Sequence, residues 1–154
     1  MANRTMNEIR AVGDDLTITR FFAHPRERVY RVFGEGGWWG PDGFTCTEAV
    51  VDAVVGGEWR GTIRNEADGA EYGFHGVYRE IVENERLVYT FIWDDPGPDT
   101  PDHVSVVTVN FEDAEGGTLM TFHQTPFISE QSRDSHGEGW SQAFDGLERM
   151  LDAG

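Results

Sequence analysis

Hydrophobic and polar residues alternate along most of the chain between residues 16 and 125, with the period of two that is typical of half-buried strands. Glycine-rich and aspartate-rich turns separate the alternating segments, so neighbouring strands should pair antiparallel. The proline-rich and acidic stretch 94–102 breaks the pattern and predicts an exposed loop. We predict strands over residues 16–22, 44–51, 59–65, 72–81, 86–93, 103–112 and 118–125.

The spacing of apolar residues becomes helical in two places. Residues 25–34 predict a short amphipathic helix that begins at Pro25. A longer helix should begin near Ser129, a plausible N-cap, and end near residue 151. Gly137 and Gly139 would let this helix approach the sheet closely or, as an alternative, hinge to admit a ligand. Its apolar stripe consists of Trp140, Phe144, Leu147 and Leu151.

These elements predict an α+β fold in which a curved sheet of six or seven antiparallel strands wraps around the long C-terminal helix. One or two short helices follow the first strand. Residues 1–12 have no clear period and are expected to form a flexible segment before a single domain over 13–153. The inward face of strand 72–81 depends on whether a bulge occurs near Gly73 or Gly76.

Composition narrows the classes of partner. The 154 residues carry a formal net charge of -16, which argues against nucleic acid or an anionic membrane surface as the partner. The only cysteine, Cys46, cannot form an intrachain disulfide, and this fits a cytoplasmic protein. The N-terminus lacks the apolar region of a signal peptide, and no apolar run is long enough to span a membrane.

Aromatic residues on successive strands suggest an apolar pocket beneath the last helix. For Trp38 and Trp39 a pocket lid and a plug of the core are alternative interpretations. The apolar pocket candidates are Trp38, Trp39, Phe44, Trp59, Tyr78, Phe91, Trp93, Met120, Phe122, Trp140 and Phe144. The polar pocket candidates are His75, His123 and Glu80.

No catalytic motif is present in the sequence. The spacing of His75, His123 and His136 matches no metal signature. We therefore assign no catalytic residue, no metal site and no cofactor from the sequence.

Seven segments in order resemble the bacterial proteins related to the activator of heat-shock protein 90 ATPase, within the START-like, polyketide-cyclase-like superfamily. The resemblance implies the helix-grip fold and a pocket for an apolar or aromatic molecule between the sheet and the last helix. The matching segments are AHPRERVY (23–30), WWGPDGF (38–44), VGGEW (55–59), FHGVYREI (74–81), ERLVY (85–89), GTLMTF (117–122) and GEGWSQAF (137–144).

Three functions follow as hypotheses. The first is a noncatalytic binder of a small apolar or aromatic molecule in this pocket. The second is an enzyme of the cyclase or hydratase type that uses His or Glu in the same cavity. The third is a module that interacts with the chaperone heat-shock protein 90, which we do not expect because the chain has only one domain. An exposed strand edge could support a homodimer.

Overall fold

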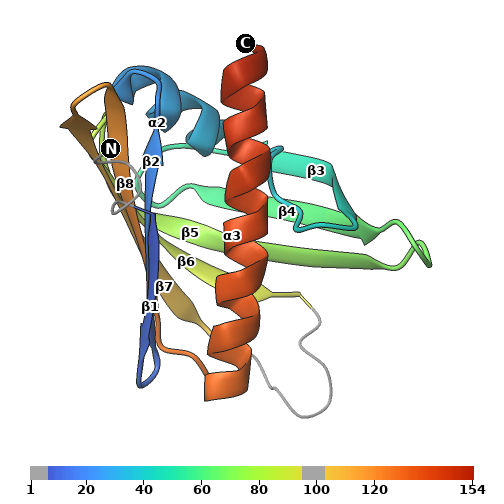
Figure 1. The fold of residues 1–154 in the computed structure, drawn as a ribbon. Coiled ribbons are helices and arrows are strands. Elements are labelled where there is room, and N and C mark those ends of the chain that lie inside the picture. Colours follow the sequence, from blue (N-terminus) through green and yellow to red (C-terminus); the bar gives the residue numbers. More distant parts are fainter. Residues whose placement is uncertain (1–6, 95–102) are drawn as a thin grey trace.

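The computed structural model describes residues 7–94 and 103–154 (Figure 1). The predicted loop over 95–102 therefore lies outside the described residues, as do residues 1–6. Along the chain the elements are β1 (Glu8–Val12), β2 (Asp15–Phe22), α2 (Arg26–Glu35), β3 (Phe44–Val51), β4 (Glu58–Asn65), β5 (Glu71–Val82), β6 (Arg86–Trp93), β7 (Ser105–Ala114), β8 (Gly117–Thr125) and α3 (Glu130–Ala153).

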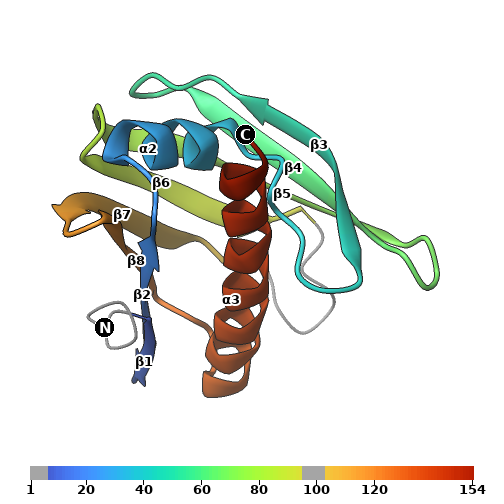
Figure 2. The same cartoon turned by 45° about the horizontal axis from the view of Figure 1, so that its top comes forward.

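The strands form one curved antiparallel sheet in the order β1-β2-β8-β7-β6-β5-β4-β3. Strands β3 to β8 pair in sequence, and the pairing of β2 with β8 joins the N-terminal strands to the end of this meander. The long helix α3 crosses the concave face, and α2 covers one end of it (Figures 1 and 2). This is the predicted helix-grip architecture. None of the described helices is both long and apolar enough to cross a membrane.

The sheet has eight strands rather than the six or seven that we predicted. Residues 8–12, assigned from the sequence to a flexible segment, form β1 and pair with β2 in the register Ile9 to Ile18. All five residues of β1 are exposed, so neither face of the strand is buried in the core. An edge strand held by its backbone hydrogen bonds leaves little trace in a hydrophobicity pattern.

Alternation correctly identifies the inner face of most strands. In β7, for example, Val107, Val109 and Phe111 are buried, while the residues between them are half-buried or exposed. In β5 the inner face holds Phe74 and Tyr78, and the bulge lies between Tyr78 and Glu80 rather than near the two glycines.

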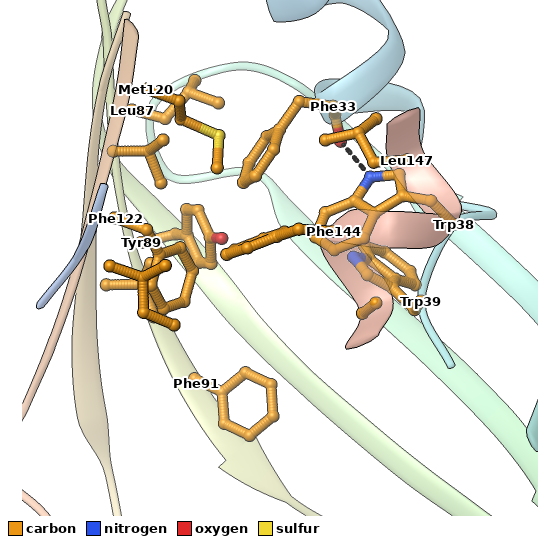
Figure 3. Packing of buried hydrophobic residues seen from close by; sticks show 14 of the residues in the cluster. Phe33, Trp38, Trp39, Leu87, Tyr89, Phe91, Met120, Phe122, Phe144 and Leu147 are labelled. Atoms are coloured by element: carbon orange, nitrogen blue, oxygen red, sulfur yellow. Dashed lines mark hydrogen bonds between the residues drawn. The ribbon is translucent and has the colours of Figure 1, made fainter. Parts of the chain in front are cut away.

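The core consists of the middle of the sheet, the inner face of α2 and the C-terminal half of α3. Phe144, Leu147 and Leu151 of the predicted stripe are buried, and Phe33 of α2 packs beside them (Figure 3). Ser129 caps α3 as predicted, since its side chain accepts a hydrogen bond from the Ser132 amide.

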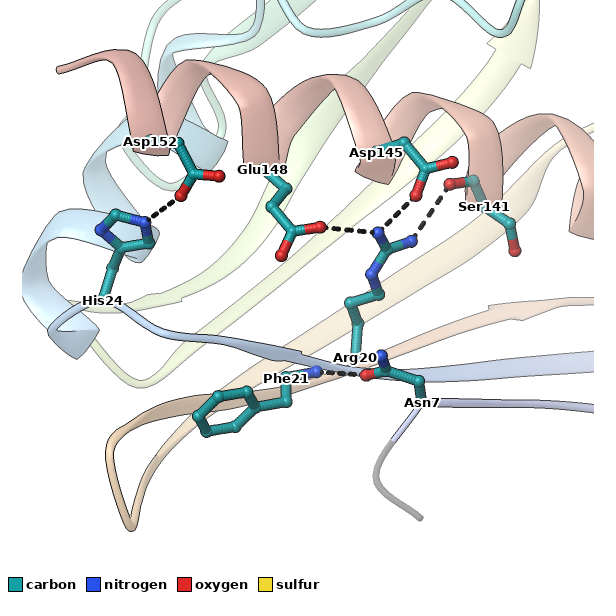
Figure 4. Close-up of polar contacts among 8 residues, drawn as sticks. All are labelled: Asn7, Arg20, Phe21, His24, Ser141, Asp145, Glu148 and Asp152. Carbon is teal, nitrogen blue, oxygen red and sulfur yellow. Dashed lines mark hydrogen bonds and ion pairs between the residues drawn. The ribbon is translucent and has the colours of Figure 1, made fainter. Parts of the chain in front are cut away.

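Helix α3 lies off-centre on the sheet. Its backbone approaches β1, β2 and α2, and polar contacts hold it there. The guanidinium of Arg20 on β2 donates hydrogen bonds to the Ser141 carbonyl, Asp145 and Glu148, and His24 pairs with Asp152 near the end of the helix (Figure 4). The strands on the other side of the sheet are therefore spanned by side chains rather than by close backbone packing.

Gly76 tests how tightly the sheet interior is packed. A Cβ at this position would lie 1.8 Å from the Thr90 oxygen, which accepts a hydrogen bond from Trp59 Nε1. Gly76→Ala should lower the free energy of unfolding by about 1–3 kcal/mol, measured by urea denaturation. Gly34→Ala is the control, because a Cβ there meets nothing within 4 Å. Equal stability of the two variants would contradict this packing.

Candidate functional site

A cavity of about 520 Å³ lies between the sheet and the N-terminal half of α3. Its volume is within the range of pockets that enclose small organic ligands. The helical side of the cavity is a single face of α3, with residues spaced by three and four positions. This face consists of Ser132, Ser135, His136, Gly139, Trp140 and Ala143.

Five of the eleven apolar candidates line the cavity. They come from three parts of the fold: the segment after α2 and the start of β3, the end of β6, and α3. Aromatic contacts connect them across the gap, since the ring centroids of Phe91 and Trp140 are 5.8 Å apart. The five are Trp39, Phe44, Phe91, Trp93 and Trp140. The sequence did not single out Ile63, Tyr72, Phe74 and Phe127, which also line the cavity.

The other six apolar candidates are buried in the core and do not line the cavity. Met120 and Phe122 are fully buried, and Phe122 packs against Phe144 of α3. Trp38 donates its indole N–H to the Phe33 carbonyl at 2.9 Å and acts as the plug that one interpretation predicted (Figure 3). Burial raises the pKa of Tyr78 to about 12. The six are Trp38, Trp59, Tyr78, Met120, Phe122 and Phe144.

The three polar candidates were wrong as cavity residues. His75 alternates with Phe74, so it lies on the outer face, where its side chain is 52% exposed and pairs with Asp94. His123 lies opposite Phe122 and faces Asp15 at 3.7 Å.

Glu80 follows the β5 bulge and pairs with Arg86 on the outer surface at 3.0 Å. The alternation of side chains along the strands places His75 and His123 on the outer face, and the bulge after Tyr78 does the same for Glu80.

Two other polar groups occupy the cavity wall, and both are satisfied within the protein. Gln124 is 1% exposed; its amide nitrogen donates to Ser105 Oγ at 2.8 Å, and its oxygen accepts from Trp140 Nε1 at 2.8 Å. The hydrogen bonds at both ends of this buried amide offset the cost of its desolvation. Gln124 could not be singled out from the sequence, because glutamine is common on exposed strand faces.

His136 is held in one neutral form. Its Nδ1 lies 2.8 Å from the Ser132 carbonyl, to which it donates, and its Nε2 accepts from Trp93 Nε1 at 3.0 Å. Burial lowers the pKa of His136; the hydrogen bond to Ser132 opposes this effect, and nearby His103 adds to it. Protonation would place a hydrogen on His136 Nε2, opposite the Trp93 N–H, and break this hydrogen bond. The contact between Trp93 and His136 in the cavity wall therefore requires neutral His136.

The described residues that line the cavity include no Asp, Glu, Lys or Arg. Within the described chain, no three His, Cys, Asp or Glu side chains gather as metal ligands. Cys46 lies half-buried on β3, and burial raises the pKa of its thiol. A protonated thiol is a poor nucleophile.

The two glycines of α3 have different surroundings. A Cβ on Gly137 would lie 3.2 Å from Leu16 Cδ1, so this glycine allows the helix to approach β2, as predicted. A Cβ on Gly139 would meet nothing within 4 Å, although Gly139 lines the cavity. Gly139 therefore leaves space in the cavity rather than permitting close packing.

The curved sheet with a cavity beneath its C-terminal helix defines a helix-grip protein of the START-like superfamily. The family model described as "Activator of Hsp90 ATPase homolog 1-like protein" matches residues 23–152. The chain belongs to this family, as the sequence resemblance implied. No curated protein matches it.

Solved structures of bacterial proteins share the fold. A protein from Chromobacterium violaceum is 28% identical, with a TM-score of 0.80, over 90% of this chain and 96% of that one. A protein from Arthrobacter aurescens is 21% identical, with a TM-score of 0.82, over 97% and 93%. The AHSA1 protein from Silicibacter pomeroyi is 23% identical, with a TM-score of 0.78, over 90% and 98%. At the two lower identities the likeness concerns the fold alone.

The difference between the two glycines can be measured. Gly139→Ala should stabilise the protein by about 1 kcal/mol, because alanine favours a helix interior and the new methyl group meets no atom. Gly137→Ala should increase the free energy of unfolding by less, since the Leu16 side chain must move to make room for the methyl group. Both are compared with the wild type by thermal and urea unfolding. A gain at Gly137 equal to that at Gly139 would contradict the different packing.

The neutral state of His136 predicts a pH dependence. Since burial holds its folded-state pKa below the unfolded value of 6.5, its contribution to stability is present above pH 6.5. That contribution should decrease as the pH falls below 6.5 toward the folded-state pKa. The wild type should therefore lose stability relative to His136→Gln between pH 7.5 and 5.5, measured by urea unfolding. The other four histidines are common to both proteins, and a constant difference would contradict the assignment.

Proposed function

We propose that this protein is a noncatalytic binder of a small hydrophobic or aromatic molecule in the cavity beneath α3. The observation that carries the proposal is the Gly139 face of the helix, where an apolar, aromatic-lined space of about 520 Å³ is left unfilled. Tyr72 and Ile128 in its wall are 43% and 44% exposed, so the cavity opens to solvent, and its apolar, aromatic lining is typical of ligand pockets. An apolar ligand would replace the missing contacts and bury further aromatic surface.

The chemistry of the wall favours binding over catalysis. A cyclase or hydratase would need a titratable group free to exchange a proton with the ligand. Both nitrogens of His136 already have partners, and Nε2 of His103 lies 2.6 Å from the Pro126 carbonyl. Among the described residues, no carboxylate lines the cavity to serve as an acid or a base.

A thermal-shift screen tests the proposal. Uncharged aromatic compounds should raise the melting temperature, and a compound at a hundredfold excess over its dissociation constant should add about 2.7 kcal/mol to stability. Gly139→Leu should place a side chain in the cavity and reduce that shift strongly, while Gly34→Ala, far from the cavity, should retain it. No shift across a broad panel of hydrophobic compounds would contradict the proposal, as would equal shifts in the wild type and Gly139→Leu.

A further inference from the structure

The five tryptophans differ in how their indole N–H groups are satisfied. Four of them donate hydrogen bonds within the protein: Trp38 to the Phe33 carbonyl, Trp59 to the Thr90 carbonyl, Trp93 to His136 and Trp140 to Gln124. Trp39 Nε1 has no acceptor within residues 7–94 and 103–154, although its side chain is only 8% exposed. Among the described residues, the buried side-chain polar atom without a partner is Arg26 Nε, so the Trp39 N–H is accessible to solvent and free to donate.

The ring of Trp39 is fixed in place. Carbons of its six-membered ring occupy the space that side chains would fill at Gly36 and Gly61. Trp59 and Phe74 contact it at ring-centroid distances of 5.4 and 5.5 Å.

Trp39 also lines the cavity, so its free N–H is a candidate donor for a ligand there. Indole nitrogen can only donate, and it therefore selects a hydrogen-bond acceptor on the ligand. A rigid donor costs little entropy when it binds.

Charge and shape narrow the ligand further. A charged ligand would lose hydration on entering the cavity. The described residues that line it include no Asp, Glu, Lys or Arg that would compensate this loss. The aromatic rings of Phe91 and Trp140 flank the cavity, and Gly139 has no side chain that would occupy it. A planar ring fits between such surfaces with the largest contact area.

We propose that the cavity takes an uncharged, planar aromatic molecule whose carbonyl-type oxygen accepts a hydrogen bond from Trp39 Nε1. The inference rests on the proposed binding function and specifies its ligand class. Trp39 is then the residue that determines specificity for the polar group, and Gly139 provides the width for the ring.

Three matched probes test this inference. They are 2-acetylnaphthalene, which has the acceptor; 2-ethylnaphthalene, which lacks it; and 2-naphthoate, which is charged. Dissociation constants come from titrations followed by protein NMR. The ketone should bind the wild type roughly tenfold more tightly than the hydrocarbon. This preference should fall to about twofold or less in Trp39→Phe, which keeps a ring but loses the N–H.

Trp59→Phe is the control, because its N–H already donates to Thr90 and its ring does not line the cavity. It should keep the preference for the ketone. Equal binding of ketone and hydrocarbon, or a preference that persists in Trp39→Phe, would overturn the inference while leaving the binding function in place. Naphthoate binding as tight as the ketone would overturn the uncharged class. Failure of all three probes to bind, with no shift in the wider panel, would overturn both proposals.

Discussion

The structure depends on one constraint: a single long helix must cover the inner face of an eight-stranded sheet. Helix α3 has 24 residues and spans about 36 Å, but it lies close to β1, β2 and α2 rather than over the centre. Arg20 anchors it on that side through its contacts with the carbonyl and carboxylates of the helix. The opposite side of the sheet must be covered by large side chains, and the cavity occurs where they do not completely fill the space.

Aromatic residues suit this gap because they reach far from their own backbone and pack at several angles. Trp140 bridges from α3 to β6 and β8, with Phe91 at 5.8 Å and Phe122 at 5.0 Å between ring centroids. Each indole also brings an N–H that must be satisfied, and this requirement explains the polar groups of the wall. Gln124 and His136 serve as acceptors for tryptophans, so they stabilise the frame of the cavity and have little capacity left for a ligand.

The sequence predicted the fold because its main features are periodic. The alternation in β6 to β8 and the stripe from Trp140 to Leu151 both follow from burial of one face. It did not predict β1, whose pairing depends on backbone groups, nor the bulge that moves Glu80 to the outer face. Site residues were harder to predict, because a pocket wall and a packed core use the same aromatic types. Trp38 and Trp39 are adjacent, yet only the second lines the cavity.

Two local features meet at the cavity, and together they favour a binding site over a packing defect. Gly139 lowers the stability of the helix by about 1 kcal/mol relative to alanine, whose methyl group would fit there without a clash. Trp39 has an indole N–H without an acceptor among the described residues, whereas the other four tryptophans donate within the protein. Natural proteins tend to break local packing rules at functional sites. A ligand that fills the space beside Gly139 and accepts from Trp39 would use both features at once, which gives the bound state its own source of stability.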